Sequence, residues 1–390
     1  MLERFSARIP QALLFIFLLW SVRSSYELLR WGLGWSDFYG QWSICAYTLR
    51  GADPYELVGI EPPLFADIGS IPSGWGTSPW GCLLGNLFYP SFLDFYHGAL
   101  MFITLNIVMI ALTALCLFNR LRHLPLPTAL MISLSLIAAP NFWRALHQGN
   151  CGGMIGCLLI IACLLVDRRP IIAGIALAFA MVKPQLALLI CFAFLLQKNY
   201  RPLIVAALID LSAWAVTSIM VERSPITLLR EFLSSDIGGN AFKGILTLAK
   251  NDLPGVGWVM PLSMLIGIAF VFVVQRSIQQ SSHSNVGLEI FMPASVAATF
   301  WSYSWDNDRF ILFIATTVAL LLMLESRNLI EQLMMFAAAA LMQFCLPLMF
   351  KLNGWLSKAY GFDAWHHTVT TFETLFILTA IMLALRLRRA

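Results

Sequence analysis

The stretch "FYHGALMFITLNIVMIALTALCLFNR", residues 95–120, decides the fold. It carries no charged side chain between His97 and Arg120. About twenty apolar residues in a helix are enough to cross the hydrocarbon core of a bilayer. Similar runs recur along the chain, at 10–29, 96–118, 125–139, 151–166, 202–221, 256–275, 289–300, 310–324, 330–350 and 368–385.

The composition supports the same interpretation. Of 390 residues, 59% are hydrophobic and only 12% are charged, whereas about a quarter of the residues in a soluble domain are charged. The sequence therefore predicts an all-α polytopic membrane protein, with a single membrane domain over residues 1–390. Most of the eight cysteines lie within apolar runs, and we interpret them as small core residues.

Charge placement predicts the topology. Basic residues near both ends, with Arg4 and Arg8 at one and Arg386 and Arg388 at the other, place both termini in the cytoplasm. Two stretches are ambiguous, because 78–90 either crosses or dips and 171–197 is either one span or a hairpin broken at Lys183. Basic loops favour the dip with the hairpin, and either pairing gives about twelve crossings.

Both pairings place the same four segments on the outer side: 31–77, 222–254, 301–309 and 351–367. We interpret the two long ones, 31–77 and 222–254, as outer loops that contain helices lying on the membrane interface. No phosphate-binding glycine loop and no basic nucleic-acid arm occurs. Nucleotide-driven transport and nucleic-acid binding are therefore disfavoured.

The first outer loop contains "WSDFYGQWSICAYTLRGADPYE", residues 35–56. Ser36 can cap a helix with Asp37 in its first turn, and Gln41 follows one turn later on the same face. We expect an amphipathic helix that ends at Gly51. The helix dipole alone favours an aspartate in a first turn, so a purely structural role for Asp37 stays open.

The segment "WSYSWDNDRF", residues 301–310, combines aromatics with charge on the same outer side. Asp306 can cap the next helix, with Asp308 and Arg309 in its first turn. A capped helix behind an aromatic belt is the simpler alternative to a site.

Two further constellations lie within apolar sequence. Arg144, His147, Gln148 and Asn150 stand between two spans, beside glycines that allow close helix packing. Lys183 is flanked by apolar residues on both sides, and a buried ammonium needs a partner such as a phosphate. Snorkelling to the interface is the alternative for Lys183.

These motifs, in this order, resemble glycosyltransferase family 87. The resemblance rests on Asp37-Phe-Tyr and Gly51-Ala-Asp-Pro-Tyr55, on His147-Gln-Gly-Asn150 and Lys183-Pro184, and on Ser302-Tyr-Ser-Trp305-Asp-Asn-Asp308. The chain departs from the family's mannosyltransferases where those carry a histidine pair after the tryptophan, because it has Asn307 and Asp308 there.

The resemblance implies a GT-C-type bundle and an inverting transfer of mannose or another sugar. The donor would be a polyprenyl-phosphate sugar, and the acceptor a glycan or glycolipid at the outer face of a bacterial inner membrane. It implies Asp37 as the catalytic residue. We expect substrate contacts from Gln41, Tyr55, Arg144, His147, Gln148, Asn150, Lys183, Trp305, Asp306, Asp308 and Arg309.

No cofactor is expected to be required, although paired acids can bind Mg²⁺ or Mn²⁺. Two other functions remain open. A transporter or flippase of lipid-linked sugars or small anions would use Lys183 at a broken helix. A non-catalytic membrane partner would tolerate alanine at Asp37.

Overall fold

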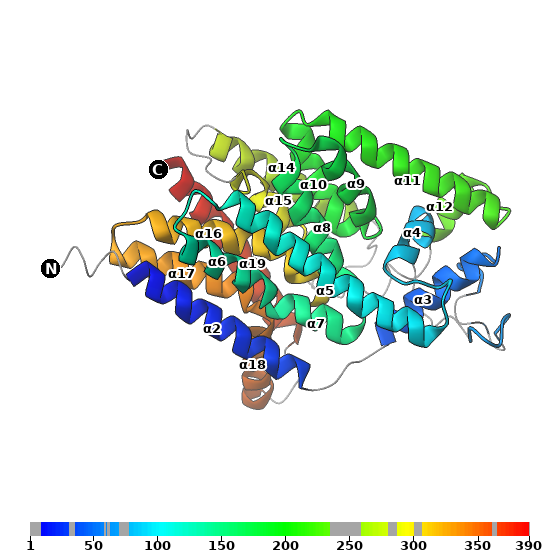
Figure 1. Cartoon of the computed structure of the whole chain (residues 1–390), viewed down its shortest axis with the longest axis horizontal. Coiled ribbons are helices and arrows are strands. Elements are labelled where there is room, and N and C mark those ends of the chain that lie inside the picture. Colours follow the sequence, from blue (N-terminus) through cyan, green and yellow to red (C-terminus); the bar gives the residue numbers. More distant parts are fainter. Residues whose placement is uncertain are drawn as a thin grey trace.

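The protein is an all-helical bundle, shown as a computed structural model in Figure 1. The structure describes residues 9–30, 36–57, 60, 63–69, 78–234, 259–279, 287–299, 306–360 and 365–389. Within these ranges there is no β-strand. The all-α prediction is therefore confirmed for the described part of the chain.

The first half of the bundle consists of α2 (Ile9–Leu29), α3 (Ser36–Leu49), α4 (Pro79–Leu84), η1 (Gly85–Leu87), α5 (Phe95–Arg120), α6 (Leu126–Ile137), α7 (Pro140–Gln148), α8 (Gly152–Leu165), α9 (Pro170–Ala180) and α10 (Pro184–Leu196). The second half consists of α11 (Tyr200–Met220), α12 (Pro225–Ser234), α14 (Val259–Gln279), η3 (Glu289–Phe291), α15 (Met292–Ala297), η4 (Asp306–Leu312), α16 (Phe313–Glu325), α17 (Leu329–Gln343), α18 (Cys345–Tyr360) and α19 (Trp365–Arg389).

Five helical stretches of the described residues are long and apolar enough to cross a membrane: 9–28, 95–120, 126–148, 200–220 and 262–279. The bent pair α17 and α18 gives a sixth if it is one span. This supports a membrane protein of several spans. The total of about twelve crossings stays a prediction.

Two predicted spans differ from the observed helices. Residues 330–350 do not form one helix, because α17 and α18 meet at a break with a bend of 86°. Pro347 explains the break, since proline lacks an N–H and its ring clashes with the carbonyl four residues earlier. Within 289–299 the α-helix α15 has only six residues, which is about 9 Å and too short to cross.

The two ambiguous stretches have the geometry of the dip with the hairpin. The helix α4 has six residues, too few to cross a bilayer. Residues 171–197 form two short helices, α9 and α10, separated at Lys183. Trp80 Nε1 donates to the Met181 carbonyl at 2.8 Å, which ties α4 to the break between α9 and α10.

The helix α8 lies at the centre of the bundle. Every residue from Gly152 to Leu164 is buried, as expected for a helix that is apolar on all sides. The glycines of α8 allow neighbouring elements to approach it closely. A Cβ on Gly156 would lie 2.6 Å from the Phe310 ring. This contact brings α8 against η4, and both elements border the polar site described below.

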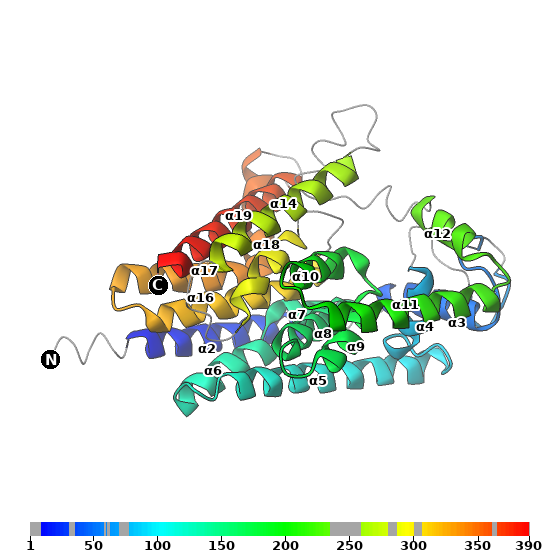
Figure 2. The same cartoon turned by 90° about the horizontal axis from the view of Figure 1, so that it is seen from above.

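The helix α3 is present as expected, but its apolar face packs on protein. Residues Trp42 to Thr48 are all buried, and Phe38 packs on Phe95, Phe102 and Tyr89. The face that was expected to meet the membrane surface is instead covered by protein. Figures 1 and 2 place α3, α4 and α12 together at the end of the bundle opposite both chain ends.

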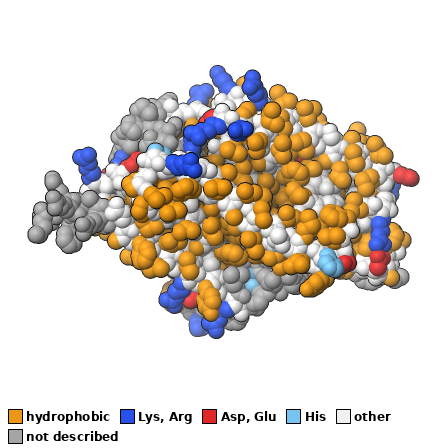
Figure 3. All heavy atoms as spheres, viewed as in Figure 1, with side chains coloured by type: hydrophobic (Ala, Val, Ile, Leu, Met, Phe, Trp, Pro, Cys, Tyr) orange, Lys and Arg blue, Asp and Glu red, His pale blue; other side chains and the backbone are white. Residues whose placement is uncertain are grey.

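The outer surface of the bundle is apolar. Figure 3 shows hydrophobic side chains over most of one face, with lysines and arginines at its margins. Exposed leucines and isoleucines on α5 and α11 belong to this surface, among them Leu115, Ile204 and Leu208. Such a surface suits contact with lipid rather than water.

Candidate active site

Four polar residues that are far apart in sequence form one hydrogen-bonded chain. Asn150 Nδ2 donates to Asp37 Oδ2 at 2.8 Å. Lys183 Nζ donates to Asn150 Oδ1 at 2.7 Å and to Asp308 Oδ1 at 2.6 Å. All four were site candidates from the sequence, one from each of the four constellations.

The turn after α7 positions Asn150. Gly149 caps α7 in the left-handed region at φ 71°, and a Cβ there would lie 2.7 Å from Phe38 Cβ. This absence of a side chain lets the turn approach α3 beside Asp37. The Gly152 amide donates to Asn150 Oδ1 at 2.8 Å, which fixes the direction of the Asn150 amide.

Lys183 and Asp308 form a buried ion pair. The Lys183 side chain is 15% exposed, and that of Asp308 is fully buried. The lysine therefore does not snorkel to the interface, and its internal partner is a carboxylate with the Asn150 amide. A buried pair of this kind is compensated in charge as long as both members remain.

Asp37 is the carboxylate of the chain that is only partly buried, whereas Asp308 is fully buried. It lies in the first turn of α3, where the helix dipole favours a negative charge. The Asn150 amide orients one carboxylate oxygen. A positioned carboxylate of this kind can accept a proton from a hydroxyl group.

The helix α7 presents further polar groups beside this chain. Arg144, His147 and Gln148 follow one another at helical spacing and share one face. Both ring nitrogens of His147 and Oε1 of Gln148 are buried without a hydrogen-bond partner among the described residues. Buried polar atoms usually have partners, so these atoms mark a place where a polar ligand fits.

Arg309 is a buried cation next to Asp308. Its side chain is 1% exposed, and its guanidinium lies 5.7 Å from the centre of the Phe376 ring. Its Nε and Nη1 have no hydrogen-bond partner within the described part of the chain. A desolvated guanidinium with open donors suits a bidentate anion such as phosphate.

The remaining predicted site residues are Gln41, Tyr55, Trp305 and Asp306. Gln41 lies one helical turn after Asp37. Tyr55 follows the opposite end of α3, and its amide donates to Asp53 Oδ1 at 3.0 Å, so Asp53 shapes the turn there. Trp305 and the side chain of Asp306 lie outside the described residues.

A second charged cluster lies at that opposite end of α3. The carboxylates of Asp53, Glu56 and Glu231 bring oxygens within 4.8 Å of one another, as a cation site would. Arg223 already pairs with two of them, with its Nε 3.3 Å from Asp53 Oδ2 and its Nη2 on Glu56.

The Arg223 guanidinium supplies the positive charge of this cluster. Glu56 raises the pKa of Arg223, while burial, followed by the nearby Asp53, raises the pKa of Glu231. These three acids could hold Mg²⁺ or Mn²⁺ only by displacing Arg223. They also stand about 20 Å from Asp37 along α3, so no catalytic step is assigned to a metal there.

Sequence reasoning missed Tyr89. Its hydroxyl accepts the Cys151 amide at 2.9 Å, and its ring stacks on Phe102 and contacts Phe38. Tyr89 thus contacts both the turn that holds Asn150 and the helix α3. The only signal in the sequence was an aromatic pair, Phe88-Tyr89, within the dipping segment.

The apolar helices and this polar chain indicate an integral membrane protein with a polar site enclosed by helices. Among known protein families, the family model of glycosyltransferase family 87 matches residues 83–273. This match supports the assignment to glycosyltransferase family 87 that the motifs indicated. Neither a curated protein nor a solved structure matched it.

The matched region includes only part of the candidate site. It contains Tyr89, all of α7, Asn150 and Lys183. Asp37 and Asp308 lie outside it and are linked to it by the hydrogen bonds of Asn150 and Lys183. The family indicates a glycosyltransferase with donor and acceptor substrates.

Proposed function

We propose that the protein transfers a sugar from a polyprenyl-phosphate donor to a hydroxyl of a glycan or glycolipid, with inversion at the anomeric carbon. The reaction takes place at the outer face of a bacterial inner membrane, in a GT-C-type bundle. Asp37 is the general base. The single observation that carries this proposal is the chain from Asp37 through Asn150 and Lys183 to Asp308.

The chemistry is a single displacement. Asp37 takes the proton of the acceptor hydroxyl as that oxygen forms a bond to the anomeric carbon. The bond between the anomeric carbon and the phosphate oxygen breaks, and the lipid phosphate leaves with the electron pair. The acceptor attacks on the side opposite the phosphate, which inverts the configuration.

The cations of the site stabilise the leaving phosphate. Arg309 is buried with open donors, and Arg144 and His147 lie on the face of α7 beside Asn150. Fixed charges aimed at a developing anion lower the barrier most in an enclosed site. Asp308, held by Lys183, orients hydroxyls of the sugar or acceptor, and so does Asp306.

The test is transfer by membranes that contain the Asp37→Asn variant. Labelled polyprenyl-phosphate sugars are supplied as a panel, and products are detected by mass. We expect wild-type membranes to form a product and Asp37→Asn to reduce its rate at least about 10³-fold. The control is Asp67→Asn, an exposed aspartate of the same loop, which should keep near-normal activity.

Full activity of Asp37→Asn at equal protein level would remove Asp37 from the mechanism. A transporter remains the second candidate, because Lys183 lies at the break between α9 and α10 and broken helices form substrate sites in transporters. Translocation of lipid-linked sugar by reconstituted vesicles, with no transfer product from any donor, would favour that alternative.

A further inference from the structure

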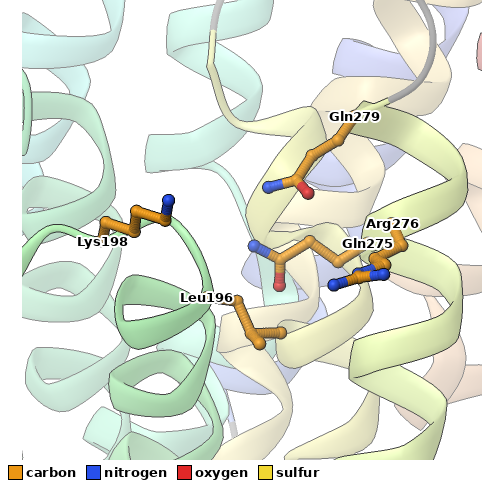
Figure 4. Close-up of a pocket in the computed structure, with 5 residues that line it drawn as sticks. All are labelled: Leu196, Lys198, Gln275, Arg276 and Gln279. Atoms are coloured by element: carbon orange, nitrogen blue, oxygen red, sulfur yellow. The ribbon is translucent and has the colours of Figure 1, made fainter.

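A polar pocket lies at the far end of α10 from the candidate active site. It has a volume of about 340 Å³ and is lined by Leu196, Lys198, Gln275, Arg276 and Gln279. Figure 4 shows these side chains reaching toward one space from the end of α10 and from the last turns of α14. Lys183 precedes α10 and Lys198 follows it, which separates the two sites by about 20 Å.

The pocket has an excess of positive charge. Lys198 and Arg276 contribute two cations, and neither forms an ion pair with a carboxylate in the described part of the chain. The Arg276 guanidinium lies 4.8 Å from the centre of the Phe272 ring, which holds it at the edge of the apolar surface. Two such cations favour an anionic ligand.

Gln275 indicates independently that the ligand carries a hydrogen-bond donor. Its side chain is fully buried, and its Nε2 donates to the Ala193 carbonyl at 3.2 Å. Only nitrogen can donate to a carbonyl, so the orientation of the amide is fixed. Its Oε1 then lacks a partner among the described residues, and a ligand in this pocket satisfies it by supplying a donor such as a hydroxyl.

The surface beside the pocket is apolar. Leu195 is 48% exposed, Phe272 39% and Val273 64%, and these residues adjoin the pocket residues on α10 and α14. A ligand that combines an anionic head with apolar chains therefore fits both surfaces. Basic pockets between helix ends are a known binding mode for anionic lipid headgroups.

We propose that this pocket binds the headgroup of an anionic phospholipid that carries a free hydroxyl, as a phosphoglycerol headgroup does. Lys198 and Arg276 contact the phosphate, and Gln275 Oε1 accepts from the hydroxyl. The acyl chains lie along Leu195, Phe272 and Val273. This inference is independent of the proposed glycosyl transfer, because it uses none of the residues of that site.

The experiment measures lipid binding to the full-length protein in detergent by native mass spectrometry. The probe is phosphatidylglycerol, with phosphatidylcholine as the neutral comparison. The double variant Lys198→Asn/Arg276→Gln removes both charges, and asparagine tolerates the positive φ of 58° at Lys198. We expect it to weaken phosphatidylglycerol binding about tenfold or more.

The matched control is Arg168→Gln/Arg169→Gln. It removes the same charge from two exposed arginines between α8 and α9 that do not line the pocket. We expect this control to bind phosphatidylglycerol like the wild type. An equal loss in both double variants would reduce the effect to general charge attraction and overturn the pocket.

Two further probes define the ligand. Phosphatidylpropanol has the same charge and chains as phosphatidylglycerol but no headgroup hydroxyl, so it should bind several-fold more weakly if Gln275 accepts from that hydroxyl. Glycerol phosphate tests the source of the phosphate and should compete poorly. Equal retention of phosphatidylcholine, or strong competition by glycerol phosphate, would overturn the lipid assignment.

Discussion

Asn150 satisfies its neighbours in one orientation only. Its Oδ1 accepts from both Lys183 Nζ and the Gly152 amide, so its Nδ2 must face Asp37. An asparagine is the residue type that accepts at one atom and donates at the other. The residue thereby links a buried ion pair to the half-buried carboxylate that we propose as the base.

The first prediction concerns Asn150→Asp. The new carboxylate still accepts from Lys183 and Gly152 but cannot donate to Asp37, and it adds a negative charge beside it. We expect kcat to fall about 100-fold, within the range for general base catalysis, with a much smaller change in KM. Steady-state kinetics with the donor identified by the membrane assay checks this.

Whether kcat or KM changes distinguishes a positioning role of Asn150 from a binding role. A positioning role acts on the chemical step, so a variant that raised KM and left kcat intact would make Asn150 a binding residue instead. Thermal melting of the purified variant serves as the control for folding. Asn141→Asp is not a suitable comparison, because Asn141 is itself buried and contacts the Met342 carbonyl.

The buried pair of Lys183 and Asp308 gives a second prediction. Removing one member leaves an uncompensated buried charge, which costs about 3–5 kcal/mol. Lys183→Met and Asp308→Leu should therefore each lower the melting temperature and the amount of folded protein. The double variant should recover most of the stability while remaining inactive, because Asn150 loses one of its donors.

A double-mutant cycle on the melting data measures this coupling. The stability losses of the two single variants should sum to more than the stability loss of the double variant. If the losses simply added, the two side chains would not form the ion pair at 2.6 Å that the structure has. Recovered activity in the double variant would exclude both from the mechanism.

At the scale of elements, the contact between α3 and the turn after α7 decides the shape of the site. Gly149 has a positive φ, and an added Cβ would lie 2.7 Å from Phe38 Cβ and 3.0 Å from the Phe38 amide nitrogen. Rigid backbone and a buried phenylalanine cannot yield easily. Any side chain at 149 must therefore displace α3, and Asp37 with it.

We expect Gly149→Ala to destabilise the protein and to reduce transfer strongly. The matched control is Gly354→Ala on α18, where no atom lies within 4 Å of the added Cβ. Alanine is favoured over glycine inside a helix, so the control should be neutral or slightly stabilising. Melting curves and transfer rates of both variants, measured in parallel, test the contact, and equal behaviour would exclude it.

The site residues could be predicted from the sequence because polar groups within apolar runs are costly and therefore conspicuous. Asn150 and Lys183 were chosen on that ground, whereas Asp37 and Asp308 were chosen because they lie in aromatic, charged segments of the outer side that resemble the family's motifs. Their mutual contacts could not be predicted, because they depend on how α3, α7, α9 and η4 pack. Tyr89 was missed for the same reason, since an aromatic residue in a membrane protein gives no distinguishing signal.

The elements were predictable to a similar degree. Long apolar runs such as 96–118 and 202–221 became helices near the expected bounds, because hydropathy determines them directly. The burial of α3 was not predictable, since an amphipathic helix suits a membrane interface and a protein groove equally. The bend between α17 and α18 depended on Pro347, within a run that hydropathy alone presents as continuous.

At the scale of the whole molecule, the placement of the site relative to the membrane determines which donor can reach it. Asp37 lies on the end of the bundle that holds α3, α4 and α12, opposite both chain termini (Figure 2). Arg168 and Arg169 lie beyond the far end of α8 from Asn150. Basic loops favour the cytoplasmic side, and on this basis we predict that Asp37 lies at the outer face.

Cysteine labelling tests this topology. Six native cysteines are buried, and the two partly exposed ones, Cys116 and Cys191, are first replaced by alanine. Ala66→Cys then reports on the exposed loop near α3, and Arg168→Cys reports on the opposite end. A membrane-impermeant maleimide should label Ala66→Cys in intact cells and Arg168→Cys only after permeabilisation. The opposite pattern would give Asp37 access to cytoplasmic nucleotide sugars, and the proposal of a lipid-linked donor would then fail while the assignment of Asp37 as base could stand.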